Sequence, residues 1–102
     1  MIPVRISAAA REDLLDIALR IAEHSPDRAF TYVDEIEAKA HRIGDLPHAG
    51  PPRFHWGADV RIAIHGPYLL VYRVRDEMVQ VLRVVHGARN LDALFVAEPL
   101  PD

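Results

Sequence analysis

Three strand-like stretches follow one another in the second half of the chain, and the breaks between them are very short. The stretches run from about Val60 to His65, from Tyr68 to Arg75 and from Met78 to Val85. The breaks, "HGP" and "RDE", have the length of hairpin loops. Strands joined by so few residues pair as antiparallel neighbours. The sequence therefore predicts a three-stranded antiparallel meander.

The first half of the chain predicts one short strand and two helices. "IPVRIS" alternates apolar and polar residues, which is the period of a half-buried strand. Ser7 can then cap a helix from Ala8 to about His24. Pro26 suits the first position of a second helix, which runs to about Ile43 and which Gly44 ends. The predicted apolar stripes are Leu14, Ile17, Ala18 and Ile21, widened by Leu15, Leu19 and Ala22, in the first helix, and Phe30, Val33, Ile36, Ala40 and Ile43 in the second.

These patterns together predict an α+β fold. Its order is an N-terminal strand, an antiparallel two-helix hairpin, the three-stranded meander and a short C-terminal helix. Both long helices should pack on one face of the sheet, because nothing else in the chain can bury their apolar stripes. With 102 residues, the chain has room for one domain, 1–102, and for no separate catalytic domain.

Composition excludes several classes of protein and site. The chain has no cysteine, so disulfides and thiolate metal sites are excluded. Its six histidines lack paired metal-ligand spacing, and we expect neither a metal nor a cofactor. No apolar run approaches the roughly 18 residues of a membrane span, and no basic-then-apolar leader precedes the first strand. We therefore expect a cytoplasmic protein without a membrane partner.

Positive charge is concentrated on the predicted sheet. Residues 1–52 carry 6 basic and 9 acidic side chains, residues 53–91 carry 6 and 3, and residues 92–102 carry none and 3. The net charge of −3 argues against a general nucleic-acid binder, and we expect no sequence-specific nucleic-acid binding by this chain alone.

One face of the predicted meander has the composition of a docking surface. Strict alternation puts an apolar centre with arginines around it on this face. Such a surface suits another protein chain, although the arginines also fit the solvated edge of an ordinary sheet. The expected docking residues are Val71, Arg73, Arg75, Val81, Arg83 and Val85.

The segment "VLRVVHGARNLDALF" ends a strand and begins a short helix. Gly87 permits a turn conformation that β-carbons disfavour. His86 suits a hydrogen-bonded structural role better than an acid/base role, because no partner for proton transfer lies nearby in the sequence. Arg89 leads into the helix and can meet an acidic patch or a phosphate. The apolar residues Leu91, Leu94 and Phe95 can either pack on the core or bind a partner.

The order and wording of these segments resemble the RelE/ParE toxins of type II toxin–antitoxin systems. The resemblance covers nearly the whole chain. It is carried by "LPHAG" with Arg53, by "YLLVYRV" and by "VLRVVHGARNLDALF". No single piece is specific, but their order and spacing are.

The resemblance implies one of two activities. One branch of this superfamily cuts messenger RNA in the ribosome, whereas the ParE branch poisons DNA gyrase without being a nuclease. Ile62 and Ile64 stand where the ribonucleases often have basic residues, and Phe95 stands where they often have a tyrosine. Neither isoleucine nor phenylalanine can bind phosphate or transfer a proton. The resemblance therefore favours the ParE branch and no enzymatic activity.

Two alternatives stay open at this stage. A ribosome-dependent endoribonuclease would use His86, Arg89 and Arg83. A degenerate toxin would only bind its antitoxin and co-repress the operon.

The resemblance also implies partners. A cognate ParD-like antitoxin, with an acidic and apolar segment that folds on binding, should cover the docking residues and the exposed side of the helical hairpin in a toxin–antitoxin hetero-oligomer. DNA gyrase should be recognised by the terminal segment, through His86, Arg89, Leu91, Leu94 and Phe95.

Overall fold

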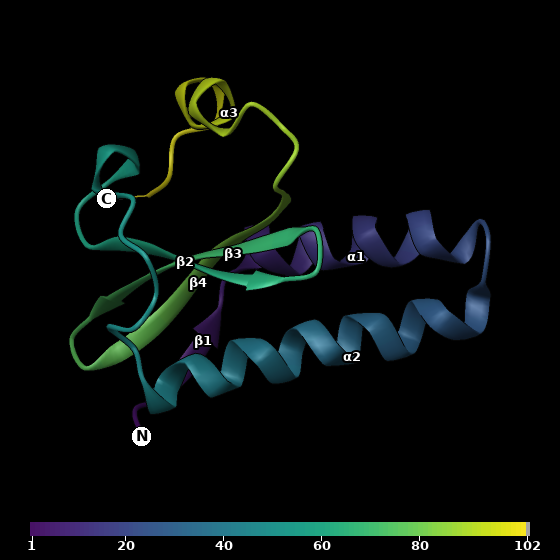
Figure 1. Ribbon diagram of the computed structural model, residues 1–102, viewed down its shortest axis with the longest axis horizontal. Helices are drawn as coiled ribbons and strands as arrows, with labels where there is room; N and C mark the ends of the chain where they lie inside the picture. Colours follow the sequence, from purple (N-terminus) through teal and green to yellow (C-terminus); the bar gives the residue numbers. More distant parts are fainter. Residues whose placement is uncertain (102) are drawn as a thin grey trace.

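A four-stranded mixed sheet forms the centre of the molecule (Figure 1). The computed structural model describes residues 1–101. The strand order is β1-β4-β3-β2. The strands are β1 (Val4–Ile6), β2 (Val60–His65), β3 (Tyr68–Arg75) and β4 (Met78–His86). The helices are α1 (Ala8–Ala22), α2 (Pro26–Arg42) and α3 (Leu91–Ala97), and two 3₁₀ turns are η1 (Ile43–Asp45) and η2 (Phe54–Trp56).

The predicted meander is confirmed, with two-residue turns at both hairpins. β2 pairs with β3 up to His65 and Tyr68, and Gly66 between them has a φ of 55°, which favours glycine. The β3–β4 turn places two residues with side chains, Asp76 and Glu77, in the left-handed region, at φ values of 54° and 57°. This conformation matches the right-handed twist of the strands.

β1 closes one edge of the sheet by pairing parallel to β4, from Val4 opposite Val79 to Ile6 opposite Val81. Its start lies close to the end of the helical hairpin, where the Ile2 amide donates to the carbonyl of Gly44 at 3.0 Å. A β-carbon at Gly44 would collide with the carbonyl of Ile2. Gly44 therefore permits this close approach in addition to following the helix.

The two long helices cover one face of the sheet, as predicted (Figure 1). Ser7 caps α1: its hydroxyl oxygen accepts from the Ala10 amide at 3.1 Å and its hydroxyl group donates to the Leu82 carbonyl at 3.0 Å. Pro26 occupies the first position of α2. The core between helices and sheet, which we call the hairpin cluster, contains Ile6, Ala10, Leu14, Ile17, Ile36, Ala40, Ile43, Tyr68, Leu70, Tyr72, Val79, Val81 and Val84.

The predicted stripes were too wide at three positions. Leu15 and Leu19 are each 59% exposed, and Phe30 is 78% exposed. The sheet covers only one side of the hairpin, so apolar residues on the flank of each helix stay outside the core. They leave an apolar surface on the hairpin.

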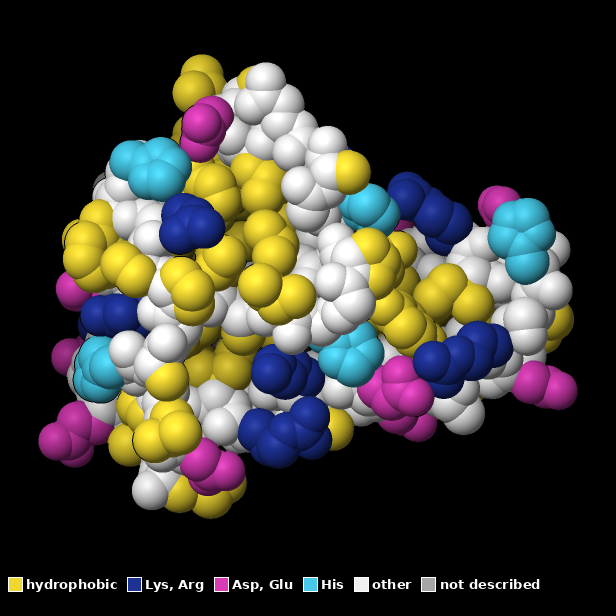
Figure 2. Space-filling model, viewed as in Figure 1, with side chains coloured by type: hydrophobic (Ala, Val, Ile, Leu, Met, Phe, Trp, Pro, Cys, Tyr) yellow, Lys and Arg dark blue, Asp and Glu magenta, His cyan; other side chains and the backbone are white. Residues whose placement is uncertain are grey.

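The short C-terminal helix covers the opposite face of the sheet, so the sheet lies between two layers (Figure 1). The core on this side, which we call the α3 cluster, contains Val60, Ile62, Val71, Leu82, Val85, Leu91, Leu94, Phe95 and Leu100. Trp56 and Leu69 pack against it. Figure 2 shows hydrophobic side chains below α3 and also between the two long helices.

Candidate functional site

The sheet face that was predicted to be a docking surface is covered by other segments of the same chain. Val71 and Val85 lie on this face as predicted, but both are 3% exposed or less. Leu91, Leu94 and Phe95 of α3 and Leu100 of the tail lie over them. This face is therefore not an open surface in this structure. Strand alternation identifies a face, but it does not reveal which later segment of the same chain will cover it.

Val81 lies on the opposite face from Val71 and Val85, which corrects the prediction for this residue. The register between β3 and β4 shifts by one residue: Val71 stands opposite Arg83, whereas Tyr72 stands opposite Val81. Leu82 is the extra residue of this bulge. A bulge reverses the alternation on either side of it. Val81 therefore packs under the helices in the hairpin cluster and is 1% exposed.

Arg83 is tied to two other segments of the chain. Its Nε and Nη2 atoms donate to the two carboxylate oxygens of Asp13 in α1, at 2.8 and 3.0 Å. Its Nη1 atom lies 3.5 Å from a carboxylate oxygen of Glu98, beyond α3. The hydrogen bonds with Asp13 raise the pKa of Arg83 above its usual value. Arg83 thus links both helical layers across the edge of the sheet.

The other two arginines of the expected docking surface differ in exposure. Arg73 is 2% exposed and lies on the α3 side, where its Nη2 atom is next to Gly57. Arg75 is partly exposed at the end of β3. Of the six predicted docking residues, only Arg75 and Arg83 are partly exposed, and the other four are buried.

The terminal segment begins with a tight turn at the end of β4. The Nδ1 atom of His86 accepts a hydrogen bond from the Ala88 amide at 3.1 Å. The Gly87 amide donates to the Pro67 carbonyl at 2.8 Å, and the Arg89 amide donates to the His86 carbonyl at 3.1 Å. This geometry confirms a structural, hydrogen-bonded role for His86. Arg89 itself is exposed.

The predicted target-binding residues divide into two groups. Leu91, Leu94 and Phe95 are buried and hold α3 on the sheet. Of the two roles that the sequence allowed, packing on the core and binding a partner, the structure shows packing. The Asn90 side chain caps α3 by accepting from the Ala93 amide at 3.1 Å. Only the side chains of His86 and Arg89 remain accessible among the five predicted residues.

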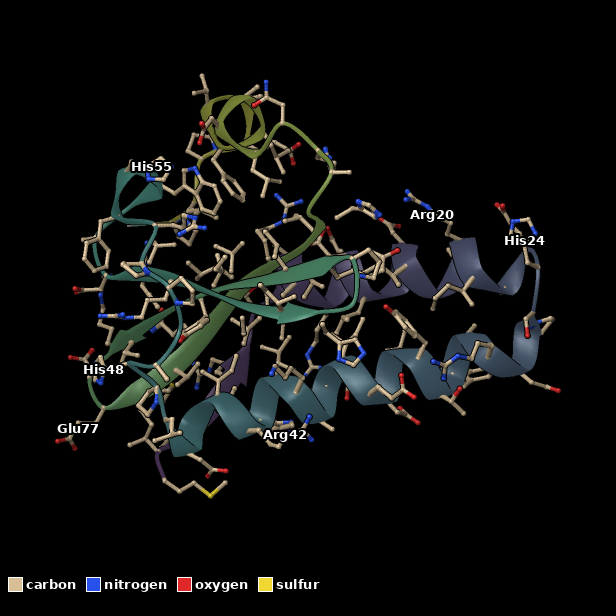
Figure 3. The ribbon with its side chains drawn as sticks, viewed as in Figure 1. Arg20, His24, Arg42, His48, His55 and Glu77 are labelled. Carbon is tan, nitrogen blue, oxygen red and sulfur yellow. The ribbon has the colours of Figure 1, made fainter. Side chains whose placement is uncertain are left out.

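Sequence reasoning missed a cluster that joins η2 to α3. The Trp56 indole Nε1–H donates to Oδ1 of Asp92 at 2.6 Å, and Nε2 of His55 lies 3.3 Å from the same oxygen. The hydrogen bond from Trp56, followed by the charge of His55, lowers the pKa of Asp92. The rings of Trp56 and Phe95 meet edge to face with 5.0 Å between their centroids. Trp56 therefore packs against α3, and His55 lies beside it, below α3 (Figure 3).

The flank of the helical hairpin forms a shallow apolar groove of about 270 Å³. Leu15 and Phe30 line it from opposite helices, and the small residues Ala18 and Ala29 leave room between them. Arg11, Asp34 and Glu37 supply charges of both signs at its margin. Most apolar residues of this groove were predicted from the sequence to lie in the core.

Two further findings concern metals and membranes. Within residues 1–101, no group of three histidine or acidic side chains is placed to hold a metal ion. No helix in this part of the chain has both the length and the apolar content needed to cross a membrane.

Comparisons with known proteins agree with the geometry. A family model described as the ParE toxin of the type II toxin–antitoxin system parDE matches residues 4–91. A structure of the chromosomal ParDE system from P. aeruginosa superposes with a TM-score of 0.74 at 21% identity, covering 84% of this chain and 96% of that chain. A chain of the toxin–antitoxin complex RelBE2 from Mycobacterium tuberculosis superposes with a TM-score of 0.61 at 32% identity, covering 86% of this chain and 93% of that one. No curated protein sequence matches.

Proposed function

Because this chain belongs to the ParE toxin family of type II toxin–antitoxin systems, we propose that it inhibits DNA gyrase by stabilising gyrase's complex with cleaved DNA. The terminal turn, with His86 and Arg89 accessible beside α3, is the part of the surface that we assign to gyrase. In this proposal the chain acts by binding and catalyses no reaction.

The closed sheet face is the observation that carries the proposal. Cleaving RNA through its 2′-hydroxyl requires a base, an acid and cations that reach the scissile phosphate. On the α3 side of the sheet, Ile62 is 3% exposed and Phe95 is 7% exposed, and both belong to an apolar cluster. Ile64 is exposed but apolar. These residues offer a nucleotide neither a cation for its phosphate nor a proton donor.

Two of the three candidate ribonuclease residues have a hydrogen-bond or ion-pair partner within the chain. Arg83 is held by Asp13 and Glu98, and Nδ1 of His86 is occupied by the Ala88 amide. Of the three, only Arg89 has an exposed side chain that makes no hydrogen bond or ion pair within residues 1–101. A guanidinium can bind a phosphate but cannot act as both base and acid.

A ribosome-dependent endoribonuclease is the second candidate function. It is favoured by the 32% identity to a chain of the RelBE2 complex. The two candidates make opposite predictions in one experiment. Purified chain is incubated with gyrase and supercoiled plasmid in one tube, and with programmed ribosomes in another. Linear plasmid with intact messenger supports gyrase inhibition. Cut messenger with unaffected gyrase supports the ribonuclease.

We also infer that an antitoxin neutralises this chain, since both similar structures come from toxin–antitoxin systems. The open apolar groove on the hairpin is the surface we assign to an apolar, partly acidic antitoxin segment. The original docking face is covered by α3, so an antitoxin would reach Val71 or Val85 only by lifting that helix. Phe30 is 78% exposed and lines the groove.

The antitoxin assignment is tested by co-purification with the product of the adjacent small gene. Phe30→Glu places a charge in the groove without entering the core, so it should abolish co-purification while the chain stays folded. Val96→Glu is the matched control, because Val96 is equally exposed, at 81%, but lies on α3. Loss of binding in the control alone would move the antitoxin to the α3 side.

A further inference from the structure

We propose that a polar pocket between α1 and the end of β4 binds a phosphate group, such as one from a nucleic-acid backbone. The pocket has a volume of about 280 Å³. Three separate segments supply its polar side chains: Arg20 comes from α1, Tyr68 from the start of β3, and His86 and Arg89 from the terminal turn. It shares no lining residue with the hairpin groove.

Two guanidinium groups at this pocket have no internal partner. Within residues 1–101, the side chains of Arg20 and Arg89 make no hydrogen bond or ion pair, in contrast to Arg28 and Arg83. Arg20 projects from the side of α1 on which the loop to α3 lies (Figure 3). Arginine presents its N–H groups in a planar fork that matches the oxygens of a phosphate.

Tyr68 and His86 add neutral donors to the same pocket. Nδ1 of His86 accepts from the Ala88 amide, so in the neutral ring the proton lies on Nε2, which is a donor. The Tyr68 hydroxyl makes no hydrogen bond within residues 1–101, although the residue is only 7% exposed. The two rings pack edge to face with 5.4 Å between centroids, which holds both side chains at the pocket wall.

The balance of charge in the pocket favours an anion. Asp13 lines the pocket, but its carboxylate already accepts from Arg83 and from the Val84 amide at 2.9 Å. Asp16 is then the one carboxylate that opposes Arg20 and Arg89. Within residues 1–101, the pocket thus has two arginines without an ion-pair partner and one such carboxylate, on a chain whose overall charge is −3.

A phosphate fits this donor set better than a carboxylate does. The two arginine side chains, the hydroxyl and the imidazole N–H offer more donors than the two oxygens of a carboxylate can accept. The oxygens of a phosphate can accept from all of these groups. The contacts would reach phosphate oxygens and not base edges, so binding would be independent of sequence. The proposal concerns binding by the chain alone and stands whether or not gyrase is the target.

The proposal is tested on the purified full chain with two probes, inorganic phosphate and a short single-stranded DNA. Phosphate binding is followed by NMR of the Tyr68 and His86 rings, and DNA binding by fluorescence anisotropy at low and higher salt. Arg20→Ala and Arg89→Ala should each weaken binding about tenfold, since each removes a charge-assisted hydrogen bond. Each should also reduce the slope of the logarithm of the DNA-binding constant against the logarithm of the salt concentration by about 1, as expected for the loss of one phosphate contact.

Asp16→Asn gives a prediction of the opposite sign. It removes the one opposing carboxylate and should tighten phosphate binding, a result that a merely structural role would not produce. Tyr68→Phe keeps the ring contacts and should weaken binding less than either arginine variant. Arg42→Ala is the charge-matched control, because Arg42 is exposed at the far end of α2 (Figure 3).

Each outcome decides the question. Binding of both probes that depends on Arg20 and Arg89 supports a backbone-phosphate site, and binding of phosphate without DNA supports a site for free phosphate groups. The proposal fails if neither probe binds, or if Arg42→Ala weakens binding as much as Arg20→Ala. A chain that poisons gyrase while Arg20→Ala leaves phosphate binding unchanged would overturn this inference and leave the proposed function intact.

Discussion

Arg83 and Asp13 join β4 to α1 through two parallel hydrogen bonds, of 2.8 Å from Nε and 3.0 Å from Nη2. The Asp13 carboxylate also accepts from the Val84 amide at 2.9 Å, at the sheet edge that β1 leaves uncovered. Both side chains are largely buried, at 14% and 13% exposure. Asp13→Ala should therefore leave a guanidinium and an amide without partners and lower the free energy of unfolding by about 3 kcal/mol.

Urea unfolding at constant m-value measures this change. Glu35→Ala is the control, because Glu35 also accepts two hydrogen bonds from one arginine, Arg28, but at the surface. Water replaces that partner, so the control should change stability much less. Equal losses in the two variants would contradict an internal role for the Asp13 pair.

Phe95 should be required for folding before it is required for function. It is 7% exposed in the α3 cluster and packs against Trp56, so Phe95→Ala should cost about 3 to 5 kcal/mol. Trp56 is the sole tryptophan, and its fluorescence should shift to the red as its ring becomes exposed. Val96→Ala, at a position 81% exposed, should change stability by less than about 0.5 kcal/mol. Truncation after Val85 removes Leu91, Leu94 and Phe95 together, so it tests folding and cannot isolate target binding.

Tyr72 should make the chain less stable at alkaline pH. Burial raises the pKa of Tyr72 above its usual value of 10.0, and its hydroxyl donates to the Pro47 carbonyl at 2.9 Å. Above pH about 10 the unfolded chain loses this proton first, so stability is present below that pH and is lost as pH rises through the folded pKa. Tyr72→Phe should cost about 1 kcal/mol near neutral pH and flatten the alkaline loss.

Urea unfolding near neutral pH and above pH about 10 checks the Tyr72 prediction. Burial also raises the pKa of Tyr32, so part of the alkaline loss should remain in the Tyr72→Phe variant. An alkaline loss of the same size in the variant and the parent chain would assign it to other groups.

Glu77→Gly should stabilise the chain. Glu77 lies in the β3–β4 turn (Figure 3). Its φ of 57° is unfavourable for residues other than glycine. Removing the β-carbon should therefore gain about 1 kcal/mol, less the added entropy of a glycine in the unfolded chain. Thermal unfolding measures the gain. Glu23→Gly, at the end of α1 where φ is −58°, should destabilise instead.

The meander and the helical hairpin were predictable because they depend on local signals. The breaks at Gly66 and at Asp76–Glu77, the Ser7 cap and the Pro26 start all act within a few residues of the chain. Helix and strand periods then assign a buried side to each element.

The site was less predictable because it depends on a bulge and on contacts between distant segments. The two-residue turn pairs Val81 with Tyr72 on the helical face, and the extra residue Leu82 then places Val85 on the other face. The β-branched and apolar residues around Leu82 give no signal of this shift. The pairing of Arg83 with Asp13 spans 70 positions of sequence. Nothing local to Arg83 distinguishes such an internal partner from a solvated or docking arginine.

The two apolar clusters on opposite faces of the sheet have no residue in common. Substitutions in the centre of one cluster should therefore have little energetic coupling to those in the other. A lineage with this architecture is free to change the turn and helix after β4 over many generations while the hairpin side keeps its shape. One scaffold can in this way acquire a new cellular target through the segment after β4 and still be recognised by an inhibitor that binds the helical hairpin.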